Sequence, residues 1–127
     1  MDKIVFITGA SSGIGAGCAR KFASQGASLI LNARNVNKLS ALKEELEKQY
    51  GAKIYLLPFD VRDRKAATSA LESLPKEWQS IDILVNNAGL VIGTDKEQEG
   101  SLDEWDIVID TNVKALLAMT RLIVPGM

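Results

Sequence analysis

The sequence contains no histidine among its 127 residues, and this absence excludes several kinds of active site. Metal sites built on imidazole need that side chain, and so do serine or cysteine nucleophiles that a neighbouring histidine activates. There is one cysteine, Cys18, so an internal disulfide is impossible. Its place within a helical pattern predicts a buried structural thiol.

The sequence also lacks a large excess of charge of either sign, and it lacks long apolar runs. Fifteen basic and sixteen acidic residues leave a formal net charge of −1, so no basic surface for nucleic acid or an anionic membrane is expected. No apolar run approaches the roughly 20 residues that span a bilayer. The opening MDKIVFITGA lacks the long apolar run of a signal peptide. We therefore expect a cytoplasmic protein that binds neither nucleic acid nor membrane.

What the sequence does contain is an alternation of short apolar strands and helices. Strands are predicted at 3–8, 27–33, 53–59 and 81–87, and helices at about 14–25, around Leu39 to Leu46, at 63–74 and at 102–124. Asp63 is a predicted N-cap and Gly51 a predicted C-cap. Near-continuous apolar strands that alternate with helices predict a parallel sheet covered on both faces.

This alternation predicts one domain over residues 1–127 with an α/β fold. Right-handed crossovers favour the strand order 3-2-1-4. The fold class is thus a Rossmann-type doubly wound parallel sheet, present here without its C-terminal strands.

The stretch TGASSGIG, residues 8–15, links the first strand to the first helix. Its glycines, Gly9, Gly13 and Gly15, allow the backbone to turn tightly and to approach a diphosphate, while Ser11 and Ser12 add donors. The N-terminus of the following helix carries about half a positive charge, which favours an anion. A turn that serves only strand–helix packing is the alternative, but the position after the first strand favours nucleotide binding.

The end of the second strand indicates which nucleotide is bound. Units that bind NAD usually have an acidic residue here, roughly 20 residues past the loop. This chain has LNARN instead, with no acidic residue between Asp2 and Glu44. Arg34 lies where a guanidinium could bond a 2′-phosphate, so NADP should be preferred by roughly 10- to 100-fold. The alternative is that Arg34 is an ordinary solvated arginine.

The loop TGASSGIG together with NNAG, residues 86–89, resembles the short-chain dehydrogenase/reductase family over essentially the whole chain. FDVRDR, SLPKEWQSIDILVNNAGL and DTNVKALLAMTRLIVPGM are similar to the family's NADP-dependent 3-hydroxy acid (serine) dehydrogenases. The resemblance implies an oxidoreductase that transfers hydride between NADP(H) and a hydroxyl or carbonyl group of a small substrate, for example a 3-hydroxy acid such as serine.

The resemblance also implies a set of cofactor-binding residues. These are Gly9, Ser11, Ser12, Gly13, Ile14 and Gly15 at the phosphates, Arg34 at the 2′-phosphate, Asp60 and Val61 at the adenine, and Asn86, Ala88 and Gly89 at the ribose and the central sheet edge. For Asp60 the alternative is a helix cap at the strand end. For NNAG the alternative is a plain turn, although two asparagines that look buried need partners.

Asn112 corresponds to the family's catalytic asparagine in TNV. It is the one polar residue on an apolar stripe along the predicted helix 102–124, where it could equally set the register of a helix–helix seam. The resemblance implies both roles, an asparagine that organises a proton-relay water and a helix through which subunits pair. We therefore expect a homo-oligomer, specifically a homotetramer.

The serine and the Tyr-x-x-x-Lys of the family have no counterpart in these residues. Tyr50 and Tyr55 are followed four positions later by Ile54 and Phe59, so neither fits. We expect the N-terminal, cofactor-binding half of an oxidoreductase that is inactive alone. A short scaffold protein that has lost catalysis and a nucleotide sensor are the alternatives, and a stop codon directly after Met127 would contradict the first interpretation.

Overall fold

The computed structural model describes residues 2–11, 13–87, 120, 123 and 124. In chain order the elements are β1 (Ile4–Ile7), α1 (Gly13–Ser24), β2 (Ser28–Leu31), α2 (Val36–Tyr50), β3 (Ile54–Leu56), α3 (Arg64–Glu72), the 3₁₀ helix η1 (Lys76–Trp78) and β4 (Ile83–Val85). The strands form one parallel sheet in the order β3-β2-β1-β4. This confirms the predicted fold class.

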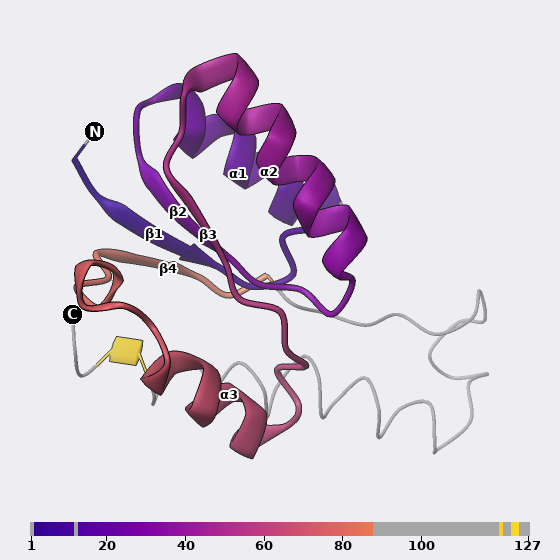
Figure 1. The fold of residues 1–127 in the computed structure, drawn as a ribbon, viewed down its shortest axis with the longest axis vertical. Coiled ribbons are helices and arrows are strands. Elements are labelled where there is room, and N and C mark those ends of the chain that lie inside the picture. The colour runs from indigo at the N-terminus through magenta and orange to yellow at the C-terminus, as the bar shows by residue number, and fades with distance from the viewer. Residues whose placement is uncertain (1, 12, 88–119, 121–122, 125–127) are drawn as a thin grey trace, which may run out of the picture.

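Helices cover both faces of the sheet, with α1 and α2 on one side and α3 on the other (Figure 1). The strands supply both cores because successive side chains point to opposite faces. Val5, Ile7 and Leu31 pack towards α1 and α2, whereas Phe6 and Ile30 pack with residues of the α3 side. Two-sided burial explains why the strands are almost uninterrupted apolar runs.

The ends of the helices follow the capping signals in the sequence. The Asn35 side chain accepts a hydrogen bond from the Lys38 amide at the start of α2, and Asp63 does the same for Ala66 at the start of α3. At the end of α2, Gly51 adopts a left-handed conformation with φ 64°, which favours glycine. The predicted caps at positions 51 and 63 are therefore confirmed.

The strands are shorter than predicted because apolar side chains remain buried after strand pairing ends. Leu57 and Phe59, predicted as strand, lie beyond β3 yet are 5% and 9% exposed. They pack in the core on the α3 side. Cys18 also differs from expectation, since it is only partly buried at the edge of the α1–α2 core.

Candidate functional site

The carboxyl ends of the parallel strands meet at one edge of the sheet, and the segments that follow them form the candidate site. These segments are the glycine loop after β1, the Asn32–Asn35 turn after β2, the stretch after β3, and Asn86 and Asn87 after β4. Each sequence-predicted site residue that the structure describes lies in one of these segments or in the first turn of α1.

The glycine loop has a backbone that requires glycine at three places. Gly9 and Gly13 have φ values of 63° and 59°, a region that other residues rarely adopt. At Gly15 a Cβ would collide with the Gly9 carbonyl oxygen and come within 2.6 Å of Asn87 Nδ2. The loop is thus held against the first turn of α1 without room for a side chain between them.

The first turn of α1 opens towards the solvent at this edge. Gly13 begins the helix, and the following residue, Ile14, is 76% exposed. The amides of a helix N-terminus and its dipole attract an anion. If a ligand binds here, the exposed isoleucine could cover part of it. If the loop is only a structural turn, the isoleucine is simply an apolar side chain in contact with water.

Asn87 holds the loop from the other side. Its backbone amide donates to Thr8 Oγ1 at 2.9 Å, and its side-chain Nδ2 donates to the Gly9 carbonyl at 3.2 Å. Thr8 in turn is anchored to β4, because its amide donates to the Val85 carbonyl. Asn86 points elsewhere, with Nδ2 donating to Thr120 Oγ1 at 3.0 Å. The predicted set included Asn86 but missed Asn87, and the need of both asparagines for partners was the signal that could have found it.

Asn32, also missed by the sequence reasoning, fixes the segment after β3. It is 1% exposed, and its Nδ2 donates to the carbonyls of Leu57 and Phe59, both at 3.1 Å. Its own carbonyl accepts from the Ala10 amide at 2.8 Å. The backbone and the side chain of one buried residue therefore connect the glycine loop, β2 and the chain leading to Asp60. The available signal was a single polar residue at the end of the apolar run LIL.

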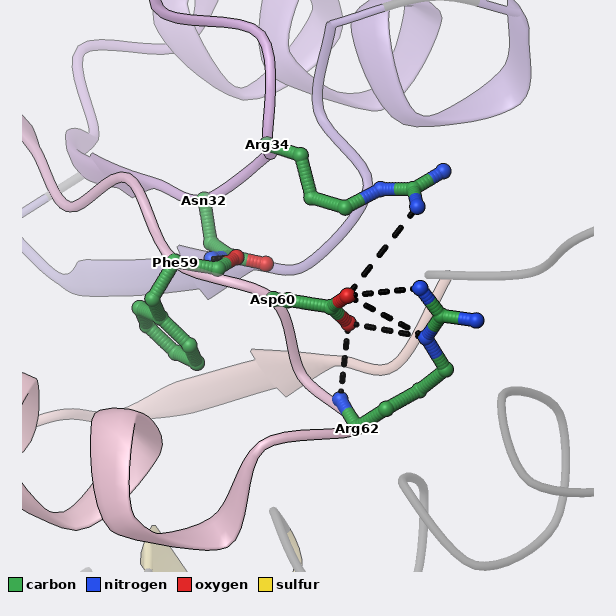
Figure 2. Close-up of polar contacts among 5 residues, drawn as sticks. All are labelled: Asn32, Arg34, Phe59, Asp60 and Arg62. Carbon is green, nitrogen blue, oxygen red and sulfur yellow. Dashed lines mark hydrogen bonds and ion pairs between the residues drawn. The ribbon is translucent and has the colours of Figure 1, made fainter.

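Three charged side chains gather beyond Asn32, as Figure 2 shows. Asp60 is paired with Arg62, whose Nη2 donates to Asp60 Oδ2 at 2.7 Å and whose Nε donates to Oδ1 at 3.1 Å. The Arg62 backbone amide donates to Oδ1 at 3.0 Å. Arg34 approaches from β2, with Nη1 4.0 Å from Asp60 Oδ2. The Arg34 side chain is 58% exposed and that of Asp60 30% exposed.

These contacts exclude one interpretation of Asp60, a cap of α3, while its role at the adenine stays a prediction. The carboxylate accepts from Arg62, while the capping of α3 is done by Asp63. The hydrogen bonds from Arg62 hold the pKa of Asp60 below its ordinary value, against the opposing effect of burial. Val61 packs in the core on the α3 side and is 6% exposed, so it presents its backbone rather than its side chain to this edge.

Other predicted residues cannot be placed. Ser12, Ala88, Gly89 and Asn112 lie outside the described residues. The same holds for the greater part of the predicted helix 102–124.

In the part of the chain that the structure describes, cysteine and acidic side chains form no group of three or more that could hold a metal ion. No helix in these residues is both long and apolar enough to cross a bilayer.

A glycine loop at a helix N-terminus, an adjacent arginine after β2 and a parallel sheet of order 3-2-1-4 together define a Rossmann-type nucleotide-binding fold. The model of the short chain dehydrogenase family matches residues 3–127. The chain belongs to that family.

Individual relatives share much of this sequence. The NADP-dependent 3-hydroxy acid dehydrogenase YdfG of Escherichia coli K12 is 45% identical over 124 residues, which are 98% of this chain and 48% of the relative. Sulfoacetaldehyde reductase 2 of Chromohalobacter salexigens is 42% identical over 125 residues, 98% of this chain and 49% of the relative. The chain therefore spans about half the length of the curated relatives it matches.

Solved structures agree with the fold. Serine dehydrogenase from Escherichia coli superposes with a TM-score of 0.87 at 45% identity, covering 98% of this chain and 56% of that one. The closed form of serine dehydrogenase complexed with NADP⁺ gives a TM-score of 0.85 at 44% identity, with coverage of 98% and 48%. L-Sorbose reductase from Gluconobacter frateurii, complexed with NADPH and L-sorbose, gives 0.87 at 33% identity, with coverage of 99% and 48%.

Proposed function

We propose that this chain is the coenzyme-binding part of an NADP-dependent dehydrogenase. The whole protein would transfer hydride between NADP(H) and a hydroxyl or carbonyl group of a small substrate, with a 3-hydroxy acid such as serine as the first candidate. The observation that carries the proposal is Arg34, which follows β2 where NAD-binding units usually have a carboxylate, two residues after Asn32, whose backbone carbonyl accepts from Ala10 of the glycine loop. Relatives that are NADP-dependent by name support it.

The described residues fit such a coenzyme at three places. The backbone of Gly9, Ser11, Gly13, Ile14 and Gly15 would hold the pyrophosphate at the N-terminus of α1, since there is no side chain between loop and helix. Arg34 would bond the 2′-phosphate. Asp60 would accept from the adenine amine. Arg62 already makes four hydrogen bonds to the two carboxylate oxygens, about as many as a carboxylate accepts, so the amine would replace the weakest of them, the Nε hydrogen shared between Oδ1 at 3.1 Å and Oδ2 at 3.2 Å.

The remaining residues are proposed in supporting roles. Ser12, Ala88 and Gly89 would complete the phosphate and ribose contacts, Asn86 and Val61 would contribute from the sheet edge, and Asn112 would organise a proton-relay water. When bound, the nicotinamide supplies or accepts the hydride. The chain's own part is to hold the nucleotide and to exclude water from one side of it.

The cofactor proposal predicts that the full gene product binds NADPH more tightly than NADH by roughly 10- to 100-fold, because a charge-assisted hydrogen bond contributes about 1.5–3 kcal/mol. Arg34→Gln should remove most of that difference and leave NADH binding nearly unchanged. Isothermal titration calorimetry measures both constants. Arg20→Gln is the matched control, since Arg20 pairs with Glu45 on the surface of α1 and α2. Equal binding of the two coenzymes by the unaltered protein would contradict the proposal.

We also propose that the protein is a cytoplasmic homo-oligomer, a homotetramer, that pairs through the predicted helix 102–124. The support is the apolar stripe of that segment in the sequence. Sedimentation velocity of the full gene product should show a species larger than the monomer at micromolar concentration. A single monomeric species over that range would overturn this proposal without affecting the cofactor assignment.

A further inference from the structure

Among the charged groups of Figure 2, Asp60 lies much closer to one arginine than to the other. Asp60 Oδ2 is 2.7 Å from Arg62 Nη2 and 4.0 Å from Arg34 Nη1. The same oxygen therefore has two possible guanidinium partners, and it lies close to only one. Arg34, at the outer limit of an ion pair, presents its side chain to solvent.

We propose that Arg62 is a specificity-determining residue, which holds the Asp60 carboxylate away from Arg34 so that Arg34 can bind a 2′-phosphate. The inference rests on the proposed function, because it concerns the preference of that same site for a phosphorylated ribose. Arg62 acts through Asp60 and is a positioning residue.

The physical reason is competition for one guanidinium. Carboxylates and phosphates bind the arginine fork in the same way, often through two parallel hydrogen bonds. If Asp60 paired with Arg34, a phosphate would have to displace the carboxylate and would meet a locally neutral pair. With Arg62 present, the three groups carry one positive charge in total, and that charge is on the arginine nearest β2.

The backbone around Asp60 is already fixed, which limits how the carboxylate can respond. The Phe59 carbonyl accepts from buried Asn32, the Asp60 carbonyl accepts from the Asp63 amide at 2.9 Å, and Oδ1 accepts from the Arg62 amide. The segment cannot easily move as a whole. Loss of the Arg62 side chain would therefore act mainly by letting the carboxylate turn towards Arg34.

The experiment compares 2′,5′-ADP with 5′-AMP, two nucleotides that differ only in the 2′-phosphate. The readout is the dissociation constant of 5′-AMP divided by that of 2′,5′-ADP, a ratio that is large when the 2′-phosphate is bound well. Both constants are measured for the full gene product at constant ionic strength, since exposed charges are screened by salt. We expect Arg62→Gln to lower this ratio about tenfold, the loss of roughly one charge-assisted bond. Arg62→Lys, which keeps the charge, should recover part of it.

A double-mutant cycle separates an action through Asp60 from a direct one. In an Asp60→Asn background the competing carboxylate is gone, so adding Arg62→Gln should change the ratio by less than about twofold. Arg20→Gln, which breaks another arginine–carboxylate pair at 2.7 Å, should leave the ratio at its original value. Circular dichroism of each variant checks that the fold is retained.

Each result has a defined meaning. An equal fall of the ratio in both backgrounds would show that Arg62 contacts the phosphate itself, and an unchanged ratio in Arg62→Gln would show a purely structural role; either overturns the inference while the cofactor proposal stands. If the unaltered protein does not distinguish the two nucleotides, both proposals are wrong. If Arg62→Gln lowers the ratio when Asp60 is present but not in the Asp60→Asn background, the inference is supported.

Discussion

Replacing Gly15 with alanine should abolish nucleotide binding. The added Cβ would meet Asn87 Nδ2 and also backbone atoms, the carbonyl carbon and oxygen of Gly9, so moving the Asn87 side chain would not relieve the clash. The loop must shift away from α1, and the phosphate-facing amides shift with it. Loss of two charge-assisted bonds of about 1.5–3 kcal/mol each corresponds to at least a 100-fold fall in affinity for NADPH.

The matched control for this substitution is Gly17→Ala, two positions further along the same helix. A Cβ at Gly17 has nothing within 4 Å, and alanine is favoured over glycine in a helix interior by about 0.5–1 kcal/mol. We expect this variant to be slightly more stable and to bind NADPH normally. Gly15→Ala should also lose about 1–3 kcal/mol of folding stability through overpacking. Unimpaired NADPH binding by Gly15→Ala would show that the loop does not hold the nucleotide as proposed.

Asn32→Asp should be the most destabilising conservative change in the described part of the chain. The buried Nδ2 donates to two carbonyl oxygens at 3.1 Å, and an aspartate would place an acceptor oxygen there. A charged carboxylate against two carbonyls, without water, costs on the order of 3 kcal/mol or more. Urea unfolding of both proteins measures the difference.

The pH dependence of this variant has a defined sign. A carboxyl at position 32 is tolerated only when protonated, so folding raises its pKa above the unfolded value. The variant should therefore approach the stability of the unaltered protein in acid and lose stability as the pH rises above about 4. Asn35→Asp is the control, because Asn35 only accepts a hydrogen bond as the N-cap of α2 and an aspartate can do the same. A pH-independent effect at position 32 would show that burial of charge is not the cause.

The sequence was sufficient for the architecture because the relevant signals are local. Apolar runs, caps such as Asp63 and Gly51, and the glycine spacing each depend on a few neighbouring residues, and the strand order follows from crossover handedness. The site was harder to predict. Asn87 takes its role from Gly9, a partner 78 positions away in the chain, and the local Asp60–Arg62 pair takes its role from Arg34, which folding places 4.0 Å from Asp60. Asn32 would look like any strand-end polar residue until the chain after β3 is placed beside it.

The pairing of β1 with β4 has a consequence for how the protein folds. Val5 pairs with Leu29 of β2 but also with Ile83 of β4, so β4 can join the sheet only after a much longer stretch of chain is closed, which is the slower event. The hydrogen bond from Asn87 Nδ2 to the Gly9 carbonyl can form only after β4 has joined the sheet, because Asn87 directly follows β4. The phosphate loop therefore reaches its final shape late, and nucleotide binding should appear together with hydrogen-exchange protection of the β4 amides during refolding.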